Sequence, residues 1–184
     1  MNKYTIISLI TYDILKNIFI PLYAIRYLYL VIEIYTDGAA SGNPGPGGYG
    51  TILRSGKHEK ELSGGFRKTT NNRMELLAVI VGLEAIKAPG ADVTIYSDSK
   101  YVVDSVEKKW VFGWVKIGFK GKKNANLWKR FLAVYKLHTV RFIWIKGHNA
   151  HPENERCDVL AVTASRGREL PADQGYEGSE LGLL

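Results

Sequence analysis

The chain has 184 residues, of which 46% are hydrophobic and 23% are charged, values typical of one globular domain with its own core. Its single cysteine, Cys157, excludes an internal disulfide and suits a reducing compartment, so we expect a cytoplasmic protein. The net charge of +7 makes a polyanionic partner plausible, although a solvated basic surface with no partner explains the charge equally well.

Residues 1–29 differ in composition from the rest and form an N-terminal extension whose role the sequence does not reveal. The apolar run over residues 14–34 is interrupted by Lys16, Pro21 and Arg26, and charges inside a bilayer are costly, so we expect no membrane helix. An interfacial segment, an extra packed element, and upstream sequence translated from an early start codon and absent from the mature protein remain open; we favour the last two.

The remaining chain predicts an α/β fold with a mixed sheet, antiparallel at the start and parallel where helices form crossovers. We place one catalytic domain over residues 30–170 and a weakly ordered, acidic tail over residues 171–184. Hydrophobic periodicity and turn signals predict the elements in this order: strands at 30–37, 49–54 and 58–66, a helix ending near 87, a strand at 93–98, helices at 99–108 and 125–137, a strand at 140–146 and a helix at 152–164.

Four carboxylates occupy suggestive positions in this arrangement. Asp37 and Asp98 each close a strand, while Glu75 and Asp158 lie in early turns of helices. Active groups gather at the carboxyl ends of parallel strands, and four converging carboxylates require cations to remain ionised. Two Mg²⁺ or Mn²⁺ ions are the natural occupants, and such a pair suits phosphodiester hydrolysis. Any one of these residues alone is more simply an ordinary cap or surface acid.

Two other features bear on nucleic-acid or nucleotide binding. The segment 45–50 formally satisfies G-x-G-x-x-G, but a strand follows it, so nucleotide binding by this loop is not expected. Residues 108–152 contain no Asp or Glu and interleave lysines with aromatic residues, which favours a nucleic-acid face over a merely solvated helix face. Within this stretch we expect Trp128 and Trp144 to lie in the core.

His148 follows the last predicted strand and precedes the helix that carries Asp158. With His151 it could suggest zinc, but no further Cys or His completes a tetrahedral site. A proton-transfer role beside a metal site and a plain loop histidine remain open.

Four blocks of sequence resemble those of type 1 ribonucleases H, in the same order: YTDGAASGNPGPGGYG (35–50), TTNNRMEL (69–76), YSDS (96–99) and KGHNAHPENERCD (146–158). The resemblance covers about residues 31–177. It implies a ribonuclease H-like fold with a five-stranded mixed sheet flanked by helices, and an endonuclease that hydrolyses the RNA strand of an RNA–DNA hybrid, leaving a 3′-hydroxyl and a 5′-phosphate.

The resemblance also implies a role for individual residues. Asp37, Glu75, Asp98 and Asp158 would hold two Mg²⁺ ions, with Mn²⁺ as a substitute, and His148 would assist proton transfer or product release. The implied hybrid-binding residues are Asn43, Thr70, Asn71, Asn72, Lys100, Trp110, Trp114, Lys116, Lys120, Lys122, Lys123 and Asn124. We expect the chain to act as a monomer.

Three positions depart from the family pattern. Lys100 stands where Gln is frequent, Phe119 where Trp is frequent, and Ala150 where Gly is common in the histidine loop. Two alternative functions are kept open, an integrase- or resolvase-like DNA nuclease on a related fold and a non-catalytic nucleic-acid-binding module; the four intact carboxylates argue against the second.

Overall fold

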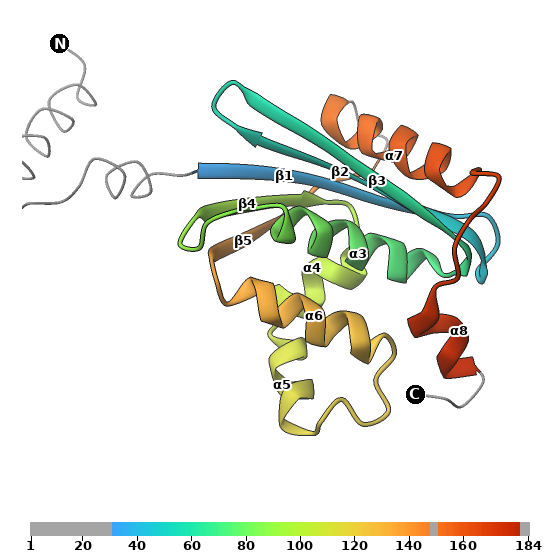
Figure 1. Ribbon diagram of the computed structural model, residues 1–184. Coiled ribbons are helices and arrows are strands. Elements are labelled where there is room, and N and C mark those ends of the chain that lie inside the picture. The colour runs from blue at the N-terminus through green and yellow to red at the C-terminus, as the bar shows by residue number, and fades with distance from the viewer. Residues whose placement is uncertain (1–30, 148–150, 181–184) are drawn as a thin grey trace, which may run out of the picture.

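The computed structural model describes residues 31–147 and 151–180. Its centre is one five-stranded sheet with the order β3-β2-β1-β4-β5 (Figure 1). Strand β1 pairs antiparallel with β2 and parallel with β4, which confirms the predicted mixed sheet. The strands are β1 (Val31–Ala40), β2 (Gly45–Ser55), β3 (His58–Thr69), β4 (Asp92–Ser97) and β5 (Thr139–Trp144).

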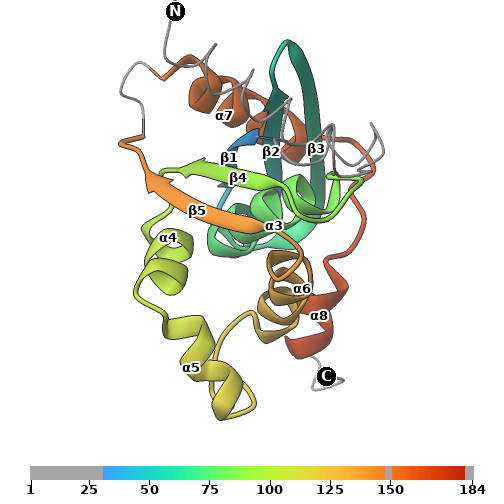
Figure 2. The same ribbon diagram turned by 90° about the vertical axis from the view of Figure 1, so that its left-hand side faces the viewer.

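Helices cover both faces of this sheet (Figure 2). Helix α7 packs on β1, β2 and β3 from one side, and α3 packs on β1 and β2 from the other side with α6 behind it. Helix α4 lies beside β5, and α5 follows α4. The helices are α3 (Asn71–Glu84), α4 (Lys100–Glu107), α5 (Trp110–Lys116), α6 (Ala125–Tyr135), α7 (Pro152–Ser165) and α8 (Gln174–Glu180).

The main core lies between the sheet and helices α3, α4 and α6. The alternate residues Ile32 and Ile34 of β1 face it, as the two-residue period of a strand requires. Trp128 is fully buried there, as predicted. Trp144 is 44% exposed, so the prediction that it lies in the core is wrong. It is the last residue of the edge strand β5, where the indole has a neighbouring strand on one side only.

Strands β1 and β2 extend further into the glycine-rich region than the sequence predicts. Residues 45–50 belong to β2. Strand β1 continues beside them, since residues 37–40 pair antiparallel with residues 47–50. A Cβ on Gly50 would lie 2.1 Å from the carbonyl oxygen of Cys157 in α7, so the glycine permits the close approach of that helix. This glycine run lies in a strand and does not open a helix, as a dinucleotide-binding fingerprint would.

The segment after α7 differs from the expected weakly ordered tail. Residues 174–180 form α8, and the preceding Asp173 is only 6% exposed. Arg67 anchors the same segment through the carboxylate of Glu177. The N-terminal extension, residues 1–29, lies outside the described residues. No helix in the described part of the chain is long and apolar enough to cross a membrane.

Candidate active site

Asp37 and Asp98 lie next to each other because their strands are parallel neighbours. Thr36 of β1 and Ser97 of β4 are register partners, and each precedes one of the two acids. The acids therefore leave the same edge of the sheet, as predicted from the strand ends. The Gly38 N–H donates a hydrogen bond to Asp37 Oδ1 at 2.7 Å.

Glu75 reaches this edge from the first turns of α3. A Cβ on Gly38 would lie 2.3 Å from the backbone nitrogen of Glu75, so the helix backbone touches β1 directly after Asp37. The Asn71 side-chain amide donates to Glu75 Oε1 at 2.7 Å, and the Ser99 hydroxyl donates to Glu75 Oε2. Both carboxylate oxygens are thus held by fixed donors, which orient Glu75 before any ligand binds.

Asp158 reaches the site because α7 packs closely on β2 at Gly50. Gly50 is the register partner of Asp37 in β2, and the carbonyl of Cys157 rests on Gly50. The residue after Cys157 is Asp158, so helix packing places it close to Asp37, whose pKa its charge affects. The Cys157 thiol donates to the Tyr35 carbonyl oxygen at 3.2 Å, and burial raises the pKa of this thiol, so it stays protonated.

The pKa of Asp37 records the convergence of the four carboxylates. This pKa is raised from 3.8 to about 8, with burial as the largest cause and the neighbouring charge of Asp98 as the next. The charges of Asp158 and Glu75 contribute smaller parts of the increase, while the Gly38 N–H opposes it. Burial and the charge of Asp98 also raise the pKa of Glu75 against its two hydrogen bonds. Carboxylates in this condition gain stability from a cation.

The donor set suits hard divalent cations. All four side chains offer carboxylate oxygens, the ligands that Mg²⁺ and Mn²⁺ prefer. Within residues 31–147 and 151–180, no group of three or more His, Cys, Asp or Glu side chains forms a ready-made metal cage. Mg²⁺ usually retains water and uses one or two carboxylates together with substrate phosphates, so an open arrangement fits it better than a closed one would.

Lys100 and Trp144 line the rim of the site beside Asp98. The Lys100 ammonium lies 5.0 Å from the centroid of the Trp144 ring, within the range of a cation–π contact. The Trp144 indole N–H donates to the backbone carbonyl oxygen of Asp98. Lys100, which the sequence predicts to bind substrate, lies over the Trp144 ring that contacts Asp98, whereas sequence reasoning gave Trp144 no role at the site.

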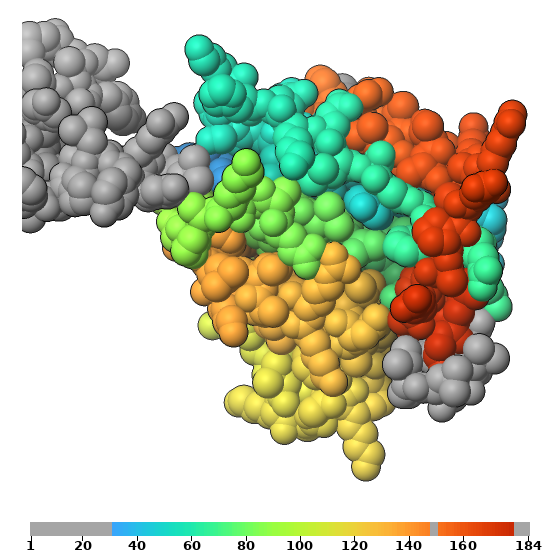
Figure 3. Space-filling model, in the orientation of Figure 1, coloured from blue at the N-terminus to red at the C-terminus, as the bar shows by residue number. Residues whose placement is uncertain are grey.

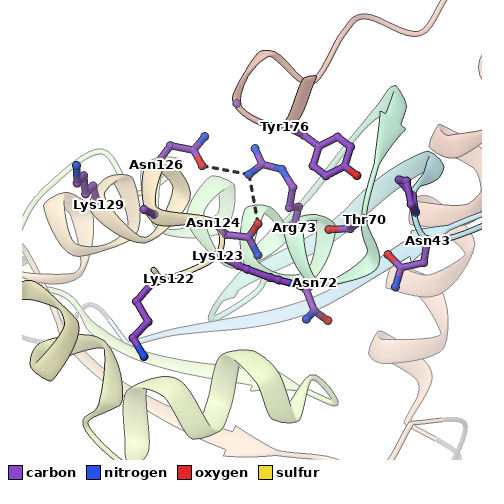
Figure 4. Close-up of a pocket in the computed structure, with 13 residues that line it drawn as sticks. Asn43, Thr70, Asn72, Arg73, Lys122, Lys123, Asn124, Asn126, Lys129 and Tyr176 are labelled. Atoms are coloured by element: carbon purple, nitrogen blue, oxygen red, sulfur yellow. Dashed lines mark hydrogen bonds between the residues drawn. The ribbon is translucent and has the colours of Figure 1, made fainter. Parts of the chain in front are cut away.

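A pocket of about 910 Å³ opens beside the N-terminus of α3 (Figure 4). We call it the polar pocket because asparagines, a threonine and basic residues make up most of its lining. Six of the predicted substrate-binding residues line it: Asn43, Thr70, Asn72, Lys122, Lys123 and Asn124. The Asn71 backbone N–H donates to Asn43 Oδ1, and the Asn71 side chain holds Glu75, so the pocket and the carboxylates share this turn. None of the described residues that line the pocket carries a carboxylate.

Four further predicted substrate-binding residues, Trp110, Trp114, Lys116 and Lys120, lie on α5 and the loop after it, outside the lining of the polar pocket. We call residues 110–123 the handle; its helix and loop project from the body in yellow (Figure 3). Trp110 is 48% exposed, while Trp114 packs edge-on against Trp128 and carries the Lys122 ammonium above its ring. Lys116 and Lys120 are exposed. The handle thus presents basic side chains to solvent over an aromatic base.

Comparison with known proteins identifies the family of the chain. The sequence model of the RNase H family matches residues 31–166. The chain belongs to the ribonuclease H family. It is 57% identical over 157 residues to a protein of Lachnoclostridium phytofermentans named Ribonuclease H, covering 79% of this chain and 99% of that protein.

Two solved structures extend the match to ribonucleases H in three dimensions. The crystal structure of LC9-RNase H1, a type 1 RNase H with the type 2 active-site motif, has a TM-score of 0.70 at 28% identity and covers 84% of this chain and 83% of its own. That of LC11-RNase H1 in complex with RNA/DNA hybrid has a TM-score of 0.54 at 28% identity, with 72% and 95% coverage. The ribonuclease H-like fold is thereby confirmed.

Sequence reasoning about this ribonuclease H left out several residues that the structure brings to the site. Arg73, Asn126, Lys129 and Tyr176 also line the polar pocket. For Arg73 the sequence does offer one indication. It is a charged residue among apolar residues of a predicted helix, and a buried charge requires a partner. His148 and Ala150 lie outside the described residues. The neighbouring glycine, residue 147, approaches Asp98 so closely that a Cβ there would lie 2.5 Å from Asp98 Oδ2.

Proposed function

We propose that this ribonuclease H hydrolyses the RNA strand of an RNA–DNA hybrid at the edge of the sheet where Asp37, Glu75, Asp98 and Asp158 converge. The observation that carries the proposal is the raised pKa of Asp37, about 8, to which all three other acids contribute. Perturbed carboxylates gathered beside a carboxylate-free polar pocket are suited to a polyanionic substrate and its cations. The hybrid is bound by the LC11-RNase H1 relative.

The four carboxylates would hold two divalent cations, Mg²⁺ or Mn²⁺. When bound, these ions supply Lewis-acid activation of water and stabilise the charge that develops on the leaving oxygen. Attack of water on the scissile phosphate with departure of the ribose 3′-oxygen would leave a 3′-hydroxyl and a 5′-phosphate. The amide of Asn71 and the hydroxyl of Ser99 keep Glu75 in one orientation throughout.

The remaining predicted residues bind and orient the hybrid. Lysines of the handle and of the polar pocket neutralise backbone phosphates, and Asn72 and Asn124 offer amide groups to sugars and phosphates. Recognition of 2′-hydroxyls on one strand and deoxyribose on the other makes shape more important than base sequence. His148 would move a proton or assist product release beside Asp98, and we propose that the protein acts as a monomer.

The test is cleavage of a labelled RNA–DNA hybrid in parallel with single-stranded RNA, duplex RNA and duplex DNA, each with Mg²⁺ and with EDTA. We expect RNA to be cut only in the hybrid and only with Mg²⁺. Asp98→Asn should abolish cleavage while hybrid binding is kept. Asp92→Asn, the same change at the exposed opposite end of β4, should leave cleavage unchanged.

Two results would contradict the proposal. Robust cutting of duplex DNA would indicate an integrase- or resolvase-like nuclease instead. Hybrid cutting that survives EDTA, or that survives Asp98→Asn, would show that the four carboxylates do not form the active site.

A further inference from the structure

The geometry points to a role for the C-terminal segment in substrate binding: we propose that Asp173 positions the asparagines of the polar pocket through Arg73, and that Tyr176 forms one wall of that pocket. The ligand is the sugar–phosphate backbone of one strand of the hybrid. This inference rests on the proposed function, since it assigns the pocket to the same substrate.

The first step is the buried ion pair between Asp173 and Arg73. The Arg73 Nε and Nη2 atoms donate to the two Asp173 carboxylate oxygens, each at 2.7 Å. The two side chains are only 3% and 7% exposed. Asp173 is itself held by the Thr69 hydroxyl at 2.7 Å and by the Tyr176 backbone N–H at 3.2 Å. A bidentate guanidinium–carboxylate pair of this kind fixes the plane of the guanidinium.

The second step is the use of the remaining guanidinium nitrogen. Arg73 Nη1 points toward α6 and donates to Asn126 Oδ1 at 3.1 Å and to Asn124 Oδ1 at 3.4 Å (Figure 4). Asn124 Nδ2 donates one bond to the Tyr101 hydroxyl at 3.0 Å. With its oxygen and one N–H engaged, the Asn124 amide is locked in plane, and its second N–H remains for a ligand in the pocket.

The third step is the wall that α8 gives to the pocket. Gly175 and Tyr176 both line it, and a Cβ on Gly175 would lie only 2.0 Å from Asn126 Nδ2. In Figure 4 the Tyr176 ring stands beside Arg73 and Thr70, on the side of the pocket away from Lys122. The C-terminal segment is therefore in contact with the same amide that Arg73 holds.

The charge of the pocket indicates the ligand class. Asp173 neutralises Arg73, so the cationic character of the lining comes from Lys122, Lys123 and Lys129. Three ammonium groups with amide and hydroxyl donors, and no carboxylate among the described lining residues, suit a phosphodiester backbone. The shared turn at Asn71 links this pocket to Glu75, so the backbone held there belongs to the nucleic acid that reaches the carboxylates.

The experiment compares Asp173→Asn with Glu177→Gln, which removes the exposed ion pair between α8 and Arg67. Binding of a labelled RNA–DNA hybrid is measured in EDTA, where no cleavage occurs, and steady-state cleavage is measured with Mg²⁺ well below the unfolding temperature. We expect Asp173→Asn to raise the Kd and the KM about five- to tenfold with little change in kcat, as displacement of a hydrogen-bonding group predicts. Glu177→Gln should stay within twofold of the parent protein.

A second variant covers the case in which Asp173→Asn does not fold. Gly175→Ala adds a Cβ against Asn126 and removes no charge, and we expect it to raise the Kd severalfold. If folded Asp173→Asn binds as tightly as the parent, or if Glu177→Gln weakens binding equally, the positioning role is wrong. Failure of the parent protein to bind or cut the hybrid would instead overturn the proposed function, so the two failures are distinguishable.

Discussion

The indole N–H of Trp144 donates a hydrogen bond to the backbone carbonyl oxygen of Asp98, with 3.0 Å between nitrogen and oxygen. This bond joins the end of β5 to the first residue after β4. The same ring lies under the Lys100 ammonium. Trp144 therefore contacts both the backbone of an active-site acid and a lysine at the rim of the site.

We expect Trp144→Phe to lower kcat about three- to tenfold, because the hydrogen bond to Asp98 is lost and one such bond contributes about 1 kcal/mol. The KM should change little, since the phenyl ring still supports Lys100. Trp144→Ala removes the ring as well and should also raise the KM. Steady-state hydrolysis of the hybrid measures both effects, and a Trp144→Phe variant with the parent kcat would show that the bond does not restrain Asp98.

The second prediction concerns the stability of the metal-free protein as pH changes. The folded state keeps a proton on Asp37 up to a pKa of about 8, whereas the unfolded chain releases it near 3.8. The free energy of unfolding should therefore fall as pH rises from about 4 to 8. Asp37→Asn removes this ionisation, so in EDTA its advantage over the parent should grow across that range, to on the order of 5 kcal/mol at pH 8.

Thermal or urea unfolding at pH 5 and pH 8 measures the difference. Mg²⁺ should stabilise the parent protein more than the Asp37→Asn variant, because the cation replaces the proton as the counter-charge. Equal differences between the two proteins at both pH values would mean that Asp37 ionises normally in the folded state.

The third prediction concerns the glycine at the contact between β2 and α7. Gly50→Ala places a methyl group 2.1 Å from the Cys157 carbonyl oxygen and 2.8 Å from the Leu160 Cβ. We expect a loss of about 1–3 kcal/mol in the free energy of unfolding, as for overpacked cores, and a lower kcat because Asp158 moves with α7. Gly113→Ala is the matched control, since a Cβ there meets nothing within 4 Å.

The control should be neutral or stabilising by roughly 0.5–1 kcal/mol, because alanine favours a helix interior over glycine. Urea unfolding gives both values. A Gly50→Ala variant as stable as the parent would show that α7 can shift away from the methyl group without loss in the free energy of unfolding. A retained kcat would show that the position of α7 does not control Asp158.

The fourth prediction concerns the exposed lysines of the handle. Lys116→Gln with Lys120→Gln should weaken hybrid binding and lower the slope of log Kd against log salt concentration by about 2, one for each phosphate that is no longer neutralised. Fluorescence anisotropy at several salt concentrations measures the slope. Lys57→Gln with Lys60→Gln, at the β2–β3 hairpin, removes the same charge elsewhere and should leave the slope unchanged. Equal slopes for the two double variants would mean that the handle does not bind phosphates.

Much of this arrangement follows from local sequence. Asp98 directly follows a strand with a clear hydrophobic pattern, and Ser99 caps α4 by accepting a hydrogen bond from the Val102 N–H. Pro152 opens α7 at the first helical position, as predicted. Such features depend on residues within one or two turns of each other, and the sequence alone is enough to predict them.

Other features depend on contacts between distant parts of the chain. Residues 45–48 form a strand because they pair with neighbouring strands and because α7 packs too closely there for a Cβ. Local sequence alone would favour a turn at these glycines. Helix α5 begins after Lys109, which has a left-handed conformation that no local pattern predicts. Helix α8 contains two glycines and is docked by Asp173, whose partner Arg73 lies 100 residues earlier. These elements can be recognised only once the tertiary structure is known.

The contact between Gly50 and the Cys157 carbonyl has a consequence for how the active site keeps its dimensions. At this contact no side chain stands between the two backbones, so the main chain sets how closely α7 can approach β2 beside Asp37. Substitutions that enlarge or shrink neighbouring side chains leave this spacer untouched. The main core lies on the other face of the sheet, so substitutions there do not bear directly on the approach of α7 to β2.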